Sequence, residues 1–319
     1  APGPGTQVAR PIFVHELQHQ YRPHRGLSFQ GVRGPYHRFT MTNAIDQDLF
    51  AFHSDATFLR AGRWQASHRY AVAGVAWDGA TTNRPGARFG PRAIREASHM
   101  LCDGTHPLFN VSPLGCVGDL GDLALPNTSL AAMREAMAAP VAAALPAAHV
   151  VWLGGDHSIT LPLLQAYRHQ WGRPLALIHF DAHCDTWTDH FGEPSGHGTW
   201  VYEAIRDGLV DARCVTQLGI RSAGDRAARE YVTQQGGRIF TARDLRGAES
   251  AAQLAPVIAA ILERHRASDA PPVYLSLDID CLDPAFAPGT GTPEPGGLTP
   301  NQVLTILEEL ADLPFIGMD

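Results

Sequence analysis

The sequence predicts an α/β fold in which helices cover both faces of a single, mostly parallel sheet. Two observations lead to this class. From residue 70 onward, short apolar runs alternate with helix-length segments, which is the order produced by strand–helix–strand units with right-handed crossovers. The apolar runs are also nearly continuous and rich in β-branched and aromatic residues, as expected for parallel strands that are buried on both faces.

The elements follow one another without an internal repeat or a low-complexity linker after residue 45. One domain is therefore expected over residues 46–319, and residues 1–45 are interpreted as a disordered N-terminal extension. Thr299 followed by Pro300 marks the start of the last helix, because Thr is a good N-cap and Pro suits the first helical position. Strands are expected over 70–77, 149–155, 175–181, 214–220, 238–242, 272–280 and 314–319, and helices near 91–100, 128–145, 158–171, 199–208, 225–235, 250–267 and 300–311.

Composition excludes several classes of function. The net charge of −7 provides no basic surface for nucleic acid, and no polybasic stretch suits an anionic membrane. The most apolar stretch, residues 139–155, is interrupted by two prolines and a histidine, so no membrane span is expected. The chain contains no lysine, which excludes a lysine Schiff base and a P-loop lysine. The 5 cysteines are scattered and form no CxxC pair, which argues against a disulfide framework and favours a reducing, cytoplasmic location.

Acidic and imidazole side chains collect where three of the expected strands end. In open α/β sheets, ligands bind beyond the carboxyl ends of the strands, so these residues lie at the edge where a site is expected. Within the second and third motifs the spacing is two residues, and alternate side chains of an extended segment point the same way. The motifs are "LGGDH", "HFDAHCD" and "LSLDIDCLDP", which supply His157, then Asp181, His183 and Asp185, and then Asp278 and Asp280.

Gathered at one place, these four carboxylates would repel one another and their pKa values would rise. Two divalent cations would neutralise the set, and a ligand set rich in oxygen with some imidazole suits Mn²⁺ better than Zn²⁺. Not every polar residue nearby joins this hypothesis. His179 is interpreted as a hydrogen-bonded core histidine, and Asp119 and Asp122 in "VGDLGDL" as turn and cap residues.

Four stretches resemble the ureohydrolase family, and most of all its agmatinases: "NRPGARFGPRAIREAS", "LGGDHSIT", "HFDAHCDT" and "SLDIDCLDPAFAPGTGTP". The similarity extends from about residue 70 to the C-terminus. It implies an arginase-like fold, a homo-oligomer, and a binuclear centre with two Mn²⁺ ions per subunit. The metal ligands implied by the resemblance are His157, Asp181, His183, Asp185, Asp278 and Asp280, the same residues that spacing and charge select.

The resemblance also implies an activity, the hydrolysis of a small guanidino substrate such as agmatine to urea and putrescine. His197 in "SGHGT" matches a family histidine that delivers a proton, and Thr292 in "GTGTP" matches a position near the guanidinium group. Asp185 would accept a hydrogen bond from the attacking hydroxide in addition to its ligand role. Other guanidino substrates, as in guanidinobutyrase or arginase, remain alternatives, as do a non-catalytic metal-binding subunit and a mononuclear zinc deacetylase on a similar fold.

The chain departs from the family at its last residues, "FIGMD". In the family this strand continues into a segment whose Glu pairs with the substrate guanidinium, so the domain is expected to be truncated. Glu294 lies at a variable family position and is not expected to replace that Glu. Loss of a bidentate, charge-assisted pair would weaken substrate binding.

The 319-residue chain should therefore bind manganese but hydrolyse guanidino substrates weakly or not at all. Elemental analysis followed by a urea-release assay tests this expectation. Bound metal without urea release favours the non-catalytic subunit. Urea release at a rate typical of the family would refute the expectation of weak turnover.

Overall fold

β4 (Leu175–Phe180) shows why the sheet forms a buried layer, since all of its residues are buried. Leu175 and Leu177 belong to one hydrophobic cluster, whereas Ile178 and Phe180 belong to a second one. Successive side chains of a strand point to opposite faces, so the two clusters lie on the two faces of the sheet. An apolar strand of this kind is stable only when both of its faces are covered.

The computed structural model describes residues 56–265 and 271–319. It contains one eight-stranded sheet in the order β2-β1-β3-β8-β7-β4-β5-β6, and the strand pairs run parallel. The extension expected over residues 1–45 lies outside the described residues. Besides β4, the strands are β1 (Tyr70–Gly74), β2 (Val117–Asp122), β3 (His149–Leu153), β5 (Val210–Ile220), β6 (Arg238–Thr241), β7 (Val273–Leu277) and β8 (Phe315–Met318).

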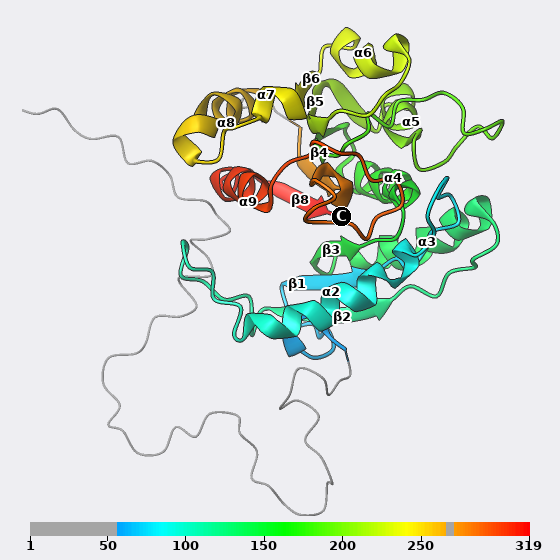
Figure 1. Ribbon diagram of the computed structural model, residues 1–319. Helices are drawn as coiled ribbons and strands as arrows, with labels where there is room; N and C mark the ends of the chain where they lie inside the picture. The colour runs from blue at the N-terminus through cyan, green and yellow to red at the C-terminus, as the bar shows by residue number, and fades with distance from the viewer. Residues whose placement is uncertain (1–55, 266–270) are drawn as a thin grey trace, which may run out of the picture.

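The helices form two layers, which confirms the expected three-layer α/β/α fold (Figure 1). Side chains of α3, α4 and α5 pack into one cluster, and those of α7, α8 and α9 pack into the other. None of the helices in the described part of the chain is long and apolar enough to cross a membrane. The helices are α2 (Gly90–Ser98), α3 (Leu130–Ala144), α4 (Thr160–Trp171), α5 (Trp200–Arg206), α6 (Arg226–Gln234), α7 (Ala242–Leu245), α8 (Ala251–His265) and α9 (Pro300–Glu309), with short 3-10 turns η1 (Phe58–Arg60), η2 (Ala87–Phe89), η3 (His99–Leu101), η4 (His157–Ile159) and η5 (Ile279–Cys281).

The start of α9 is as the sequence predicts. Thr299 accepts a hydrogen bond from the backbone N–H of Gln302, and the side chain of Gln302 accepts one from the N–H of Thr299, which completes a capping box. Pro300 occupies the first helical position.

The edge strand β2 corrects the interpretation of Asp119 and Asp122 as turn and cap residues. Both lie within β2, which pairs with β1. Asp119 is buried and receives two hydrogen bonds from Arg95 of α2, at 2.7 Å from Nε and 2.9 Å from Nη2. Asp122 accepts a further one from Nη1 of the same guanidinium. The strand tolerates these acids because a buried arginine neutralises them, which a local sequence pattern does not reveal.

The sheet order determines where the site lies. β3, β8, β7 and β4 are consecutive neighbours, and parallel strands place their carboxyl ends at one rim. The three motifs that follow β3, β4 and β7 are therefore brought to the same rim, as expected for a ligand site of an α/β sheet.

Replacing Asp119 by Ala should lower the free energy of unfolding by about 3–5 kcal/mol, because Arg95 would remain buried without its main partner. Urea denaturation followed by circular dichroism measures the change. The exposed pair Arg92–Glu96 provides the control, and Glu96→Ala should cost less than about 1 kcal/mol. An equally small effect for Asp119→Ala would show that the buried pair does not stabilise β2.

Candidate metal centre

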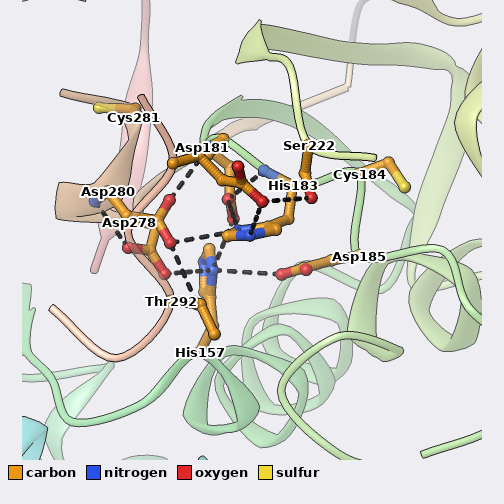
Figure 2. Close-up of polar contacts among 12 residues, drawn as sticks. His157, Asp181, His183, Cys184, Asp185, Ser222, Asp278, Asp280, Cys281 and Thr292 are labelled. Carbon is orange, nitrogen blue, oxygen red and sulfur yellow. Dashed lines mark hydrogen bonds and ion pairs between the residues drawn. The ribbon is translucent and has the colours of Figure 1, made fainter. Parts of the chain in front are cut away.

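The three strand ends bring all six predicted ligand side chains together, as Figure 2 shows. Two overlapping groups have ligand atoms that lie within 4.8 Å of one another. The first contains His157, His179, Asp181 and Asp185, and the second contains Asp181, His183 and Asp280. Asp278 joins the first group, because its Oδ2 lies 3.2 Å from Nδ1 of His157.

The side chains converge because the chain turns after each strand. The sequence instead predicts extended segments whose alternate side chains point the same way. β4 ends at Phe180, and Asp185 has a positive φ of 50°. β7 ends at Leu277, so Asp280 lies in the short 3-10 turn η5 and not in a strand. The two turns are tied together, since Oδ1 of Asp280 accepts a hydrogen bond of 3.0 Å from the N–H of Ala182.

His157 directs one ring nitrogen at three carboxylates. Its Nδ1 lies 2.9 Å from Oδ2 of Asp181 and 3.3 Å from Oδ2 of Asp185, in addition to the contact with Asp278. Although this nitrogen is buried, it makes no hydrogen bond of good geometry. A buried polar atom without a partner is costly, and an imidazole nitrogen facing several carboxylates is the arrangement that a divalent cation requires.

The other nitrogen of His157 contacts Ser276. Nε2 lies 2.8 Å from Oγ of Ser276. Ser276 donates its own proton to Oδ1 of Asp319, at 2.6 Å, so its oxygen accepts from Nε2–H. Nε2 therefore keeps its proton. Burial opposes the shift, but the three carboxylates that face Nδ1 raise the pKa of His157, so Nδ1 also holds a proton without a metal and would offer its lone pair to a cation once that proton leaves. Outer partners of this kind orient metal-binding histidines, and the residues of this chain fit a metal ion at Nδ1.

Asp181 links the two groups because its two oxygens face different imidazoles. Oδ2 lies 2.8 Å from Nε2 of His179, and Oδ1 lies 3.2 Å from Nδ1 of His183. His179 is fully buried, and its second nitrogen lies 3.0 Å from Nε2 of Gln217. This confirms His179 as a hydrogen-bonded core histidine, and it orients Asp181. A carboxylate with two separately engaged oxygens is suited to bridge two cations.

The cluster carries protons where a metal would bind. Burial, together with the charges of Asp278 and Asp181, raises the pKa of Asp280 to about 9. Burial opposes the shift of His183, but hydrogen bonds to Asp181 and Asp280 raise its pKa to about 12. Without a metal, both groups therefore hold protons at neutral pH, as expected for carboxylates that cannot all ionise side by side.

Asp185 is held by residues that the sequence argument missed. Its Oδ2 accepts a hydrogen bond of 2.6 Å from the indole N–H of Trp200, the first residue of α5. Its backbone carbonyl accepts hydrogen bonds from the N–H groups of Val201 and Tyr202. The start of α5 thereby fixes both the backbone and the side chain of Asp185.

The two other predicted site residues lie on loops around the cluster. Oγ1 of Thr292 lies 3.4 Å from Oδ2 of Asp280, which places Thr292 beside the second group. Among the described residues, His197 makes no hydrogen bond or ion pair with the cluster, and its Nε2 lies 3.0 Å from Oγ1 of Thr82. Its neighbour Gly198 lies against Asp185, because a Cβ at that glycine would be 4.0 Å from Oδ1 of Asp185.

Ser276, Asp319 and Glu294 were not predicted as site residues. Ser276 has the same strand parity as Asp278, so the spacing of two could have identified it. Asp319 follows β8 and reaches Ser276 only because β8 is the neighbour of β7. Glu294, which the sequence argument set aside, has Oε1 3.9 Å from Nε2 of His183 and accepts a hydrogen bond of 3.0 Å from Ser222.

Comparison with known proteins identifies the class that this fold and cluster define. Residues 68–319 match the profile of the Arginase family, and the chain belongs to this family. It is therefore a ureohydrolase, an enzyme that hydrolyses a guanidino C–N bond.

Individual relatives differ in their substrates. An agmatinase of Chromobacterium violaceum is 39% identical over 252 residues, which cover 78% of this chain and 74% of the relative. A guanidinopropionase of Pseudomonas aeruginosa is 40% identical over 299 residues, 88% of each chain. The solved structure of proclavaminate amidino hydrolase from Streptomyces clavuligerus has a TM-score of 0.76 and 35% identity, and the match covers 84% of this chain and 88% of that one.

Metal-depleted protein should bind two Mn²⁺ ions per chain and release protons as it does so. The raised pKa values of Asp280 and His183 mean that both ligands are protonated at neutral pH, and each must lose its proton to bind a cation. The apparent affinity should therefore increase as the pH rises from about 6 to about 9. Isothermal titration calorimetry in buffers of different ionisation enthalpy measures the stoichiometry and the released protons.

Asp189→Asn, in the exposed part of the loop after β4, is the matched control and should change neither quantity. A stoichiometry of one with a preference for zinc would instead indicate a mononuclear site.

Proposed function

We propose that this protein is an agmatinase-type amidinohydrolase with a binuclear manganese centre, which hydrolyses agmatine to urea and putrescine. The observation that carries the proposal is Asp181, whose Oδ2 lies 2.9 Å from Nδ1 of His157 and whose Oδ1 lies 3.2 Å from Nδ1 of His183. A carboxylate whose two oxygens face separate imidazoles supports two cations side by side. The oxygen-rich surroundings support Mn²⁺ in preference to Zn²⁺. The agmatinase relative at 39% identity supports the choice of reaction.

In this proposal, six residues hold the two ions. His157, Asp185 and Asp278 would bind one ion, His183 and Asp280 would bind the other, and Asp181 would contact both. When bound, a pair of divalent cations lowers the pKa of water and polarises the group under attack. Ser276 and His179 do not bind metal in this scheme. They hold His157 and Asp181 in the orientation seen in the structure.

The remaining residues act on the substrate and on its protons. Water adds to the guanidino carbon and the bond to the substituted nitrogen breaks, so the departing amine must gain a proton. His197 would deliver that proton, since an imidazole side chain can both accept and donate a proton. Asp185 would accept a hydrogen bond from the attacking water. Thr292, beside Asp280, would contact the guanidinium group.

The choice of an amine tail over a carboxylate tail rests on the charges around the cluster. Glu294 places a further carboxylate 3.9 Å from His183, and this negative charge favours a substrate of higher net positive charge, such as agmatine, over a guanidino acid. Arg221, which lies nearby, uses its guanidinium on backbone carbonyls of residues such as Asp280, Leu282 and Glu294. Its donors are therefore committed to the loops of the site, and a carboxylate tail would have to compete with those carbonyls.

A panel of guanidino substrates should show agmatine with the highest kcat/KM, whatever the absolute rate of turnover. The panel contains agmatine, 4-guanidinobutyrate, 3-guanidinopropionate and arginine, and released urea is the readout. Glu294→Gln should reduce this preference by about tenfold, because one charge near the substrate corresponds to roughly 1.4 kcal/mol at a partly exposed site.

Asp283→Asn provides a control, because this acid is bound by backbone N–H groups of the same loop and should leave the preference unchanged. A higher kcat/KM for arginine or for a guanidino acid would overturn the choice of agmatine.

A further inference from the structure

Glu203 is a buried acid whose position the proposed reaction leaves unexplained. It lies on α5 and is only 6% exposed. Its hydrogen bonds are made with the loop of His197. Its Oε1 accepts two hydrogen bonds, 2.7 Å from Oγ of Ser195 and 2.6 Å from Oγ1 of Thr199. These two hydroxyl groups stand two residues before and two residues after His197. One carboxylate therefore holds both sides of the segment that carries the proposed proton donor.

The same segment is fixed internally. Oγ1 of Thr199 accepts a hydrogen bond of 2.9 Å from the N–H of Gly196. A Cβ at Gly196 would lie 2.1 Å from Nδ1 of His190, so the backbone here packs directly against that ring. The ring centroids of His190 and His197 are 5.6 Å apart. Glu203, through Ser195 and Thr199, adds two further hydrogen bonds to those that hold the backbone around His197.

Arg134 of α3 supplies the positive charge that a buried carboxylate needs. Its Nη1 donates a hydrogen bond of 2.6 Å to Oγ of Ser195, whose own proton goes to Glu203. Its Nη2 lies 3.4 Å from the carbonyl oxygen of Ser158, the residue after His157. Arg134 thus connects the loop of His197 with the turn of a proposed metal ligand. Burial lowers the pKa of Arg134, but the charge of Glu203 opposes this shift.

A purely structural role for Glu203 would not require a buried carboxylate with a buried guanidinium. A buried ionic network often contributes less stability than apolar residues of the same volume, whereas satisfied polar networks define a single geometry. Here the geometry that is defined is that of residues 195–199. An error of about 1 Å in the position of a catalytic group can cost about 100-fold in rate, so a rigid mount for His197 has a direct consequence for turnover.

We propose that Glu203, with Arg134 as its counter-charge, is a positioning residue that holds the loop of His197 over the metal cluster through Ser195 and Thr199. This inference rests on the proposed proton-donor role of His197. It predicts that Glu203 matters to the reaction only while His197 is present.

The test compares Glu203→Leu with Glu203→Gln, because Gln retains an acceptor for both hydroxyl groups and Leu does not. Glu203→Leu should lower kcat for the best guanidino substrate by about tenfold or more, with Mn²⁺ content and KM nearly unchanged. Glu203→Gln should recover most of this loss. In a His197→Asn background, Glu203→Leu should lower kcat by less than about twofold, because the two residues act as one unit.

Hydrogen–deuterium exchange provides a readout that needs no substrate. Glu203→Leu should increase amide exchange over residues 187–199 and leave β4 protected. If the wild-type chain hydrolyses none of the substrates, the proposed function fails, but this exchange measurement still decides whether Glu203 holds the loop. The matched control is Glu230→Leu on α6, whose partner Arg226 is exposed, and which should change neither exchange nor rate.

Equal losses of kcat with and without His197 would overturn the proposal, and so would unchanged exchange over residues 187–199. Should Glu203→Leu fail to fold, Ser195→Ala removes one of the two hydroxyl groups and leaves the acid in place. It should produce a smaller change of the same kind, and the absence of such a change would equally overturn the proposal.

Discussion

The mutual repulsion of four carboxylates at one rim of the sheet is the constraint on which the rest of the site depends. Asp181, Asp185, Asp278 and Asp280 approach the same two imidazoles, and charges this close cannot remain uncompensated in a buried place. The raised pKa of Asp280 shows protons taking up part of that charge. Bound cations would take it up entirely, so the same arrangement that is unfavourable alone becomes a high-affinity site.

The parallel sheet makes this crowding attainable. β3, β8, β7 and β4 are neighbours, and their buried apolar residues fix the strands against both helix layers. The stability of these two cores offsets the cost of placing acids at the strand ends. β8 has a second role, because it brings Asp319 to Ser276 and so orients His157. The central strands therefore determine both the position of the ligands and the direction in which one of them points.

Local sequence patterns could predict the parts of this site that local geometry defines. Apolar runs predicted the buried strands, and spacing and charge selected the six residues that converge in the structure. They did not predict the left-handed backbone of Asp185, whose carboxylate and carbonyl accept hydrogen bonds from the start of α5. They also misjudged Asp119, whose burial depends on Arg95 from a different element. Contacts between distant residues, such as Ser276 with Asp319, leave no local signature.

Two of the polar networks beside the cluster orient different histidines. Ser276 and Asp319 lie behind His157 and set the direction of its lone pair. Glu203 and Arg134 lie behind His197 and set the position of a residue that carries a mobile proton in the proposed reaction. A metal ligand is held in place by its cation once bound, but a proton donor has no such restraint. The network that combines a buried carboxylate with a guanidinium therefore stands where only the protein can provide order.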